Sequence, residues 1–339
     1  MEIPEVNRGP LDISEGNLQD KYFEEEEEEN PFHNARYPEN LDHGELEESD
    51  GYHNTHQEVS HLFAIKDLGS LRYFLRVEVK PFSSGIFFSQ TKYTKDLHRA
   101  RMIESSPLNT PMVIKEKATT SDHDPVDVTS YQSIVGALQY LTFTQPADII
   151  HAVNRVCQNF NSPTLVHLKA VKQILRYFKG TQHYGVSYLA KSPISFYGFC
   201  DAGWAGCPTT RRSTTEFCTF LGANCISWCS KKQPTVARSS SEAEYQSMAS
   251  TTAEITWLTF LLQDIGISLF KPPQLFCDNV SGLHMSVNPM FHARSKHIKC
   301  DYHFVSEKVA MGNLITRYIS SASQPANIFT KPLPNDSFS

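Results

Sequence analysis

The stretch that follows Gly180 constrains the fold most, because strand-like and helix-like patterns alternate there in a definite order. Short apolar runs bounded by turn residues predict strands, and longer segments with apolar residues three and four positions apart predict helices. Strands are expected at 194–201, 215–221, 225–229, 274–278 and 314–319, and helices at 241–266, 280–287, 297–311 and 325–331. Three strands followed by alternating helices and strands indicate an α/β fold, with a mixed five-stranded sheet and flanking helices.

The part of the chain before Gly180 shows a different pattern. Residues 71–79 and 85–89 alternate apolar and polar side chains around a Ser-Ser-Gly turn, which predicts a β-hairpin. Helices are expected at 92–102, 131–144, 149–160 and 166–179, with a polar linker at 113–129. The last of these helices carries a basic stripe formed by Lys169, Lys172, Arg176 and Lys179. A solvated helix face is the simpler interpretation of this stripe, and contact with a phosphate backbone is the alternative.

The first 58 residues differ in composition from the rest, with few apolar side chains and a run of glutamates at 24–29. Such a segment cannot bury enough apolar surface to offset the entropy of ordering, so residues 1–58 are predicted to be a disordered acidic tail. Residues 1–50 contain 17 acidic and 3 basic side chains, so the net charge of −6 divides into −14 here and +8 in the remainder. A basic body favours a polyanionic partner such as nucleic acid.

The eight cysteines show no C-x-x-C spacing, so neither a zinc site nor a disulfide framework is expected. They are interpreted as small buried apolar side chains. Their positions are Cys157, Cys200, Cys207, Cys218, Cys225, Cys229, Cys277 and Cys300. No run reaches the ~18 apolar residues of a membrane span and no signal-peptide pattern is recognisable. An intracellular protein, cytoplasmic or nuclear, is therefore expected.

Three carboxylates occupy positions that suit metal-assisted hydrolysis of a phosphodiester. This chemistry needs anionic oxygen ligands from separate elements that converge on two Mg²⁺ ions about 4 Å apart. Asp201 ends or lies within the first strand of the C-terminal region, Glu244 lies in the first turn of the long helix, and Asp278 closes a later strand. A carboxylate in an apolar strand is costly to bury unless it is paired or binds a metal.

Each of these positions also has a purely structural interpretation. Asp201 can simply turn the chain into the next loop. If Ser239 is the N-cap of the long helix, Glu242 completes a capping box, and Glu244 points about 200° around the helix axis from Glu242, free to face the sheet. The reverse assignment, with Ser241 as the cap and Glu244 in the box, stays open. Asp278 is itself a good N-cap, unless Asn279 takes that place.

Several motifs, in the order in which they occur, resemble the ribonuclease H region of copia-type LTR retrotransposon Pol polyproteins. They include Phe199-Cys-Asp-Ala-Gly-Trp-Ala-Gly, Ser240-Ser-Glu-Ala-Glu-Tyr, Cys277-Asp-Asn and Ile328-Phe-Thr-Lys-Pro-Leu. Upstream, Lys66-Asp-Leu-Gly-Ser-Leu resembles the end of a reverse transcriptase palm, and Tyr131-Gln-Ser-Ile-Val-Gly and Leu175-Arg-Tyr-Phe-Lys-Gly resemble the thumb and connection. The resemblance runs from about residue 61 to residue 334.

The resemblance implies a division of the chain into segments. These are the acidic tail (1–58), a β-hairpin remnant of the reverse transcriptase palm (59–112), small thumb and connection helices (113–190), a ribonuclease H-like domain (191–334) and a short tail (335–339). The family's palm carries a Tyr-x-Asp-Asp turn, and this chain contains no Asp-Asp pair. Nucleotidyl transfer by two metals would lack its ligands, so the chain is not expected to act as a reverse transcriptase.

The resemblance assigns Asp201, Glu244 and Asp278 to the first three metal-binding carboxylates. It implies Mg²⁺, with Mn²⁺ as an alternative, and cleavage of the RNA strand of an RNA–DNA hybrid. The family's fourth active-site aspartate is replaced here by Asn327, whose amide oxygen brings no negative charge, so weaker metal occupancy and slower turnover are expected. The alternative is a catalytically inactive nucleic-acid-binding relic.

Several basic residues are candidate phosphate contacts in this ribonuclease-like region. They are Lys231, Lys232, Arg238, Arg294, Lys296 and His297. An ordinary surface position is the simpler interpretation of His297, and a role in product release is the alternative.

Four further positions depart from the family pattern. Gly203 and Cys207 stand where the family tends to have acidic residues, and Arg76 and Glu216 replace glycines. Arg76 is expected to strain the chain if its position needs a positive φ.

Overall fold

The fold is taken from a computed structural model that describes residues 69–101, 105–112, 124–142, 147–207, 209–287 and 299–329. The predicted tails at 1–58 and 335–339 lie outside these residues, as does most of the predicted linker at 113–129. Among the described helices, none combines the length and the apolar character needed to cross a membrane.

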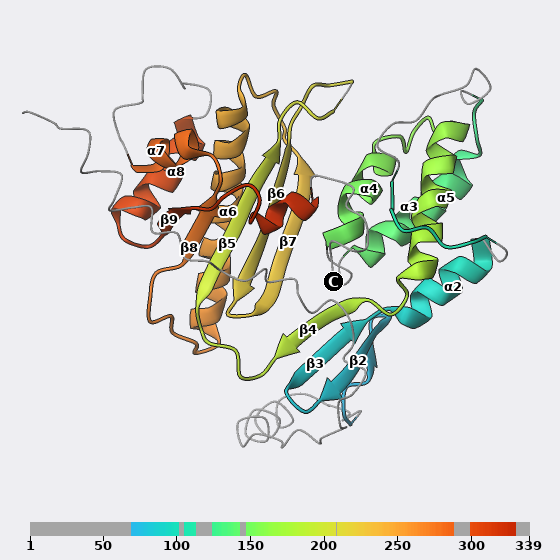
Figure 1. The fold of residues 1–339 in the computed structure, drawn as a ribbon, viewed down its shortest axis with the longest axis horizontal. Helices are drawn as coiled ribbons and strands as arrows, with labels where there is room; N and C mark the ends of the chain where they lie inside the picture. Colours follow the sequence, from blue (N-terminus) through green and yellow to red (C-terminus); the bar gives the residue numbers. More distant parts are fainter. Residues whose placement is uncertain are drawn as a thin grey trace, which may run out of the picture.

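A five-stranded mixed sheet forms the centre of the C-terminal region (Figure 1). Its strands are β5 (Phe196–Gly203), β6 (Thr214–Leu221), β7 (Asn224–Lys232), β8 (Gln274–Cys277) and β9 (Ile315–Tyr318). The order across the sheet is β7-β6-β5-β8-β9, with β5, β6 and β7 antiparallel and β8 and β9 parallel to β5. The predicted mixed five-stranded α/β fold is confirmed.

The two faces of this sheet are covered by different elements. The helices α6 (Ser240–Asp264), α7 (Val280–Val287) and α8 (Lys299–Ala310) share a core with one face, where Cys200 and Leu275 pack against Tyr245. Because successive strand residues point to opposite faces, Phe199 and Phe276 lie in a second core with the 3₁₀ turn η5 (Pro325–Phe329). The catalytic candidates therefore come from both sides of the sheet and from the sheet itself, with Glu244 on α6, Asn327 on η5, Asp201 on β5 and Asp278 directly after β8.

A bundle of helices precedes the sheet and packs beside it (Figure 1). Its helices are α2 (Thr91–Arg101), α3 (Val128–Leu141), α4 (Ala147–Cys157) and α5 (Leu165–Gly180). The amide of Asn154 on α4 donates to the Ser230 carbonyl on β7 at 2.5 Å, and the indole of Trp228 donates to the Thr142 carbonyl at 2.9 Å. These bonds attach the bundle to the β7 edge of the sheet.

Two of the four basic residues of the α5 stripe are engaged by the protein itself. Arg176 donates to both the carbonyl and the hydroxyl of Ser106, and Lys179 donates to the Ser105 carbonyl at 2.7 Å. This part of the stripe holds the segment that follows α2, which neither of the two sequence interpretations anticipated.

A second, antiparallel sheet has the order β1-β2-β3-β4. It contains the predicted hairpin as β2 (Val77–Phe82) and β3 (Gly85–Ser89), together with β1 (Tyr73–Phe74) and β4 (Gly185–Leu189). Strand β4 was not predicted from the sequence. It pairs with β3 from about a hundred residues further along the chain, so no local pattern announces its partner.

The β1–β2 connection contains strained residues. Phe74 pairs with Val77, so Leu75 and Arg76 form a two-residue turn, and both have positive φ, 46° and 62°. Turns of this kind favour glycine or asparagine, because a Cβ atom is crowded at positive φ. The positive φ on which the expected strain at Arg76 depends is therefore present. Its guanidinium lies over the Tyr93 ring, 4.8 Å from the centroid, which offsets part of the cost.

Candidate active site

Asp201 lies within β5, which continues to Gly203, so the structural alternative of a strand-end turn is wrong. The residue is 9% exposed and faces Glu216 across the antiparallel β5–β6 pair. The next strand on the other side is β8, whose Cys277 pairs with Cys200. Asp201 therefore lies beside the end of β8, from which Asp278 emerges.

The N-cap of α6 decides which of the two glutamates in its first turns faces the sheet. The Ser239 hydroxyl accepts a hydrogen bond from the Glu242 amide at 3.2 Å, so Ser239 is the N-cap and the alternative with Ser241 is wrong. Glu242 Oε2 accepts from the Arg238 amide at 2.9 Å, one residue before the position that a regular capping box would use. Glu242 is thus a capping residue, and Glu244 is left to face the sheet.

Glu244 is a buried carboxyl group with one unsatisfied oxygen. It is 7% exposed, and within the described structure its Oε2 atom has no hydrogen-bond partner. Burial, followed by the nearby Cys277, Asp201 and Asp278, raises the pKa of Glu244 to about 10, although a backbone hydrogen bond from Ala202 acts in the opposite direction. Such a group keeps its proton at neutral pH unless a cation approaches, which is typical of a metal ligand without its metal.

Asp278 follows β8 directly and is partly exposed. Asn279 Oδ1 accepts from the Gly282 amide at 2.9 Å, so Asn279 caps α7 and Asp278 does not. The Ser321 hydroxyl donates to Asp278 Oδ2 at 2.5 Å. The Asp278 carboxylate is therefore oriented by a neighbouring loop and has its other oxygen available for a ligand.

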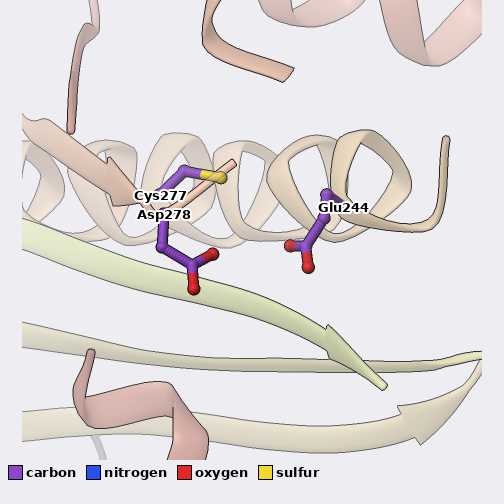
Figure 2. Close-up of side chains that lie close together, drawn as sticks. All are labelled: Glu244, Cys277 and Asp278. Atoms are coloured by element: carbon purple, nitrogen blue, oxygen red, sulfur yellow. The ribbon is translucent and has the colours of Figure 1, made fainter. Parts of the chain in front are cut away.

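Figure 2 shows Glu244, Cys277 and Asp278 close together at this end of the sheet. One ligand atom from each residue, a thiol sulfur and two carboxylate oxygens, lies within 4.8 Å of the other two. Asp201 is not one of these three residues. Its negative charge, on strand β5, is nevertheless one of the causes that raise the pKa of Glu244. Cys277 was not predicted as a site residue, and the only sequence signal was its position directly before Asp278.

Asn327, the fourth predicted site residue, lies in η5 and is linked to the site through Ser321. Its amide nitrogen donates to the Ser321 carbonyl at 2.7 Å, and the Ser321 hydroxyl contacts Asp278. Asn327 therefore supports the loop that orients Asp278, and it adds no negative charge.

Comparison with known proteins places this site in a family, although no family model matches the chain. The Pol polyprotein of transposon RE1 from Arabidopsis thaliana is 43% identical over 288 residues, which are 84% of this chain and 20% of that protein. An uncharacterized mitochondrial protein of Arabidopsis thaliana is 49% identical over 201 residues, which are 59% of this chain and 83% of that protein. The chain belongs to the copia-type retrotransposon Pol polyproteins.

The copia-type chain spans about a fifth of the length of the Pol polyproteins that it matches. Two solved structures are also similar. A ribonuclease H1 isolated from compost is 13% identical over 43% of this chain and 99% of its own, with a TM-score of 0.33. A foamy viral protease–reverse transcriptase in complex with an RNA/DNA hybrid is 11% identical over 73% of this chain and 29% of its own, with a TM-score of 0.42.

Three of the six predicted phosphate contacts of this copia-type chain lie within the described residues. Lys231 and Arg238 are exposed near the β7–α6 connection, whereas Lys232 donates to Gln158 Oε1 at 2.9 Å and to Cys207 Sγ at 3.2 Å. Lys231 and Lys232 line a cavity of about 620 Å³ between the bundle and the sheet. The other predicted contacts, Arg294, Lys296 and His297, lie outside the described residues.

Glu216, which was expected to replace a glycine of the family, is fully buried. Burial, and then the neighbouring Asp201, raises the pKa of Glu216 well above its usual range. The Gly203 amide and the Ser230 hydroxyl donate weakly to its carboxyl group, at 3.3 Å and 3.4 Å. Burial and the Asp201 charge therefore both disfavour the charged form of Glu216.

Cys207, which was expected to replace an acidic residue of the family, is a buried thiol that accepts a hydrogen bond from Lys232. Burial alone would raise the pKa of its thiol, but hydrogen bonds from Thr210, Lys232 and Thr209 outweigh burial and lower the pKa to about 6. The lowered pKa favours the thiolate form of Cys207, to which the Lys232 ammonium donates at 3.2 Å.

Proposed function

We propose that the chain hydrolyses the RNA strand of RNA–DNA hybrids with Mg²⁺ or Mn²⁺ held by Asp201, Glu244 and Asp278. The observation that carries the proposal is the buried Glu244 carboxyl group, whose Oε2 atom lacks a partner while Asp278 and Asp201 surround it. A buried oxygen of this kind costs free energy unless a ligand satisfies it. Carboxylates from β5, α6 and the end of β8 fit a hard divalent cation.

The chain's own residues would hold the metal ions and orient the carboxylate ligands. Asp201, Glu244 and Asp278 supply the ligand oxygens, and the Ser321 hydroxyl keeps the Asp278 carboxylate in one orientation. When bound, the metal ions activate water and stabilise the leaving oxygen of the phosphodiester. The exposed Lys231 and Arg238 would contact phosphates of the hybrid, which position the substrate without revealing its sequence to the protein.

Asn327 favours a slower enzyme than a four-carboxylate site would give. Its amide removes one negative charge from the metal environment and instead donates to Ser321. The same observation favours the second candidate function, a catalytically inactive relic that binds nucleic acid inside the cell through its basic surface.

The two functions are separated by incubating a labelled RNA–DNA hybrid with the purified full chain in Mg²⁺ and in Mn²⁺. The proposal predicts RNA products that require metal and disappear in the Asp201→Asn variant. Salt-dependent binding without any product would instead support the relic. The matched control is Asp264→Asn at the far end of α6, which removes an equal charge from an exposed position.

A further inference from the structure

The tightest group of candidate metal ligands in the described residues includes a sulfur atom. Cys277 Sγ, a Glu244 carboxylate oxygen and an Asp278 carboxylate oxygen all lie within 4.8 Å of one another. In Figure 2 the three side chains come from the end of β8 and the start of α6 and border one common space. The cysteines were expected to be small buried apolar side chains, and Cys277 is fully buried in the core, but its sulfur also borders two carboxylates.

A second observation points to a ligand in this space. Glu244 is 93% buried and its Oε2 atom has no hydrogen-bond partner, so the fold leaves an acceptor unsatisfied beside the thiol. Figure 2 shows the Glu244 carboxylate turned to the same side as that of Asp278. A cation between them would satisfy this oxygen, which no described protein group does.

We propose that Cys277 is a ligand of this metal site, so that the site binds thiophilic cations such as Zn²⁺ and Cd²⁺ in preference to Mg²⁺. The inference rests on the proposed function in so far as both use Glu244 and Asp278. It extends that function by adding a donor that oxygen-seeking Mg²⁺ does not use.

The chemistry of the thiol fits this role. The Asn279 amide donates to Cys277 Sγ at 3.4 Å, so the sulfur lies against the same turn that carries Asp278. On binding, a metal–sulfur bond forms and the S–H bond breaks, and the proton passes to the buffer without any redox change. Ligand atoms around tetrahedral Zn²⁺ lie ~3.5 Å apart, so the side chains need to close by about an ångström.

The position of the thiol predicts how Zn²⁺ affects cleavage. Cys277 is fully buried and Asp278 is partly exposed, so an ion enters past Asp278 and is held on its inner side by sulfur. Zn²⁺ bound there takes two of the three carboxylates that the proposed hydrolysis assigns to Mg²⁺. Zn²⁺ is therefore expected to inhibit cleavage of the hybrid in Mg²⁺.

The test uses Cd²⁺, because a cadmium–thiolate bond gives an ultraviolet charge-transfer band that carboxylates do not give. The full chain is titrated with Cd²⁺, together with Cys277→Ser and the matched control Cys200→Ala. Cys200 is the β-sheet partner of Cys277, equally buried in the same core, and lies outside the ligand group. Zn²⁺ affinity is measured by competition with a chromophoric chelator.

We expect the unaltered chain and Cys200→Ala to share a band that Cys277→Ser loses, with Zn²⁺ affinity at least about tenfold weaker in Cys277→Ser. Serine keeps the size and polarity of the side chain, and circular dichroism establishes that the variant is folded. If Cys277→Ser does not fold, protection of Cys277 from alkylation by Zn²⁺ in the unaltered chain replaces the titration. Unprotected Cys277, or a band of equal size in folded Cys277→Ser, would overturn the proposal.

Hybrid cleavage in Mg²⁺, measured on the same samples, separates this inference from the proposed function. A Cys277-dependent band without cleavage would support Cys277 as a metal ligand and contradict the proposed nuclease activity. Cleavage without such a band would support the nuclease activity and contradict the role of Cys277 as a ligand.

Discussion

The Ser321 hydroxyl donates a hydrogen bond of 2.5 Å to Asp278 Oδ2, and this bond joins the loop before η5 to the candidate metal site. Outer residues that orient a metal ligand typically change metal affinity by about 10- to 100-fold. We expect Ser321→Ala to weaken Mn²⁺ binding about tenfold, measured by electron paramagnetic resonance titration. Ser320→Ala, which removes an exposed hydroxyl that donates to the Ser323 hydroxyl at 3.0 Å, is the control. Equal affinities for the two variants would contradict the orienting role.

Asn327→Asp is expected to strengthen the site, because it restores a negative charge next to Ser321. Cleavage of the hybrid should reach half its maximum at a Mg²⁺ concentration about tenfold lower, a change of ~1.4 kcal/mol for one added charge. Without metal, the variant loses the bond from the Asn327 amide to the Ser321 carbonyl, so its melting temperature should fall and recover when Mg²⁺ is added. Asn313→Asp, an equal charge change at an exposed position, should do neither.

At Arg76, substitution by glycine should give a more stable protein than substitution by alanine, which reverses the usual order. Both Arg76→Gly and Arg76→Ala remove the contact with the Tyr93 ring, but only glycine relieves the positive φ of 62°. We expect the glycine variant to be more stable than the alanine variant by about 1 kcal/mol in urea unfolding. The usual order, with alanine the more stable, would show that the turn is not strained at this residue.

Cys207 should react as a thiolate at an unusually low pH. Since the pKa of its thiol is lowered to about 6 from its ordinary value near 9, the reactive form is present above pH 6 and is lost as the pH falls through 6. Alkylation at Cys207, followed by peptide mass spectrometry, should therefore reach a plateau by about pH 7. In denatured protein the rate should keep rising toward pH 9. A native profile that matches the denatured one would contradict the paired thiolate.

Local chemistry explains which parts of the site could be predicted from the sequence. Once Ser239 is the N-cap of α6, helix geometry decides that Glu244, and not Glu242, faces the sheet. Asn279, and not Asp278, caps α7, and the sequence offered this alternative because the two residues are neighbours. The order of strands and helices after Gly180 likewise follows from local periodicity.

The features that the sequence did not reveal depend on contacts between distant segments. Strand β4 is defined by its pairing with β3, and Ser321 reaches Asp278 from 43 residues further along the chain. Cys277 is apolar by its sequence context, and only the approach of α6 brings it next to Glu244. The predicted helix at 325–331 is a 3₁₀ turn over Pro325–Phe329, and its last two predicted residues lie outside the described part of the chain.

The most direct measurement compares hybrid cleavage by Glu244→Gln and Glu242→Gln. The two glutamates lie two residues apart in α6 and are equally buried, but Glu242 bonds to the Arg238 amide and Glu244 faces the other carboxylates. We predict that Glu244→Gln stays folded and loses metal-dependent cleavage by about a hundredfold or more. Glu242→Gln should keep cleavage and lose about 1 kcal/mol of stability. A Glu244→Gln variant that cleaves the hybrid as fast as the unaltered chain would contradict the shared metal site.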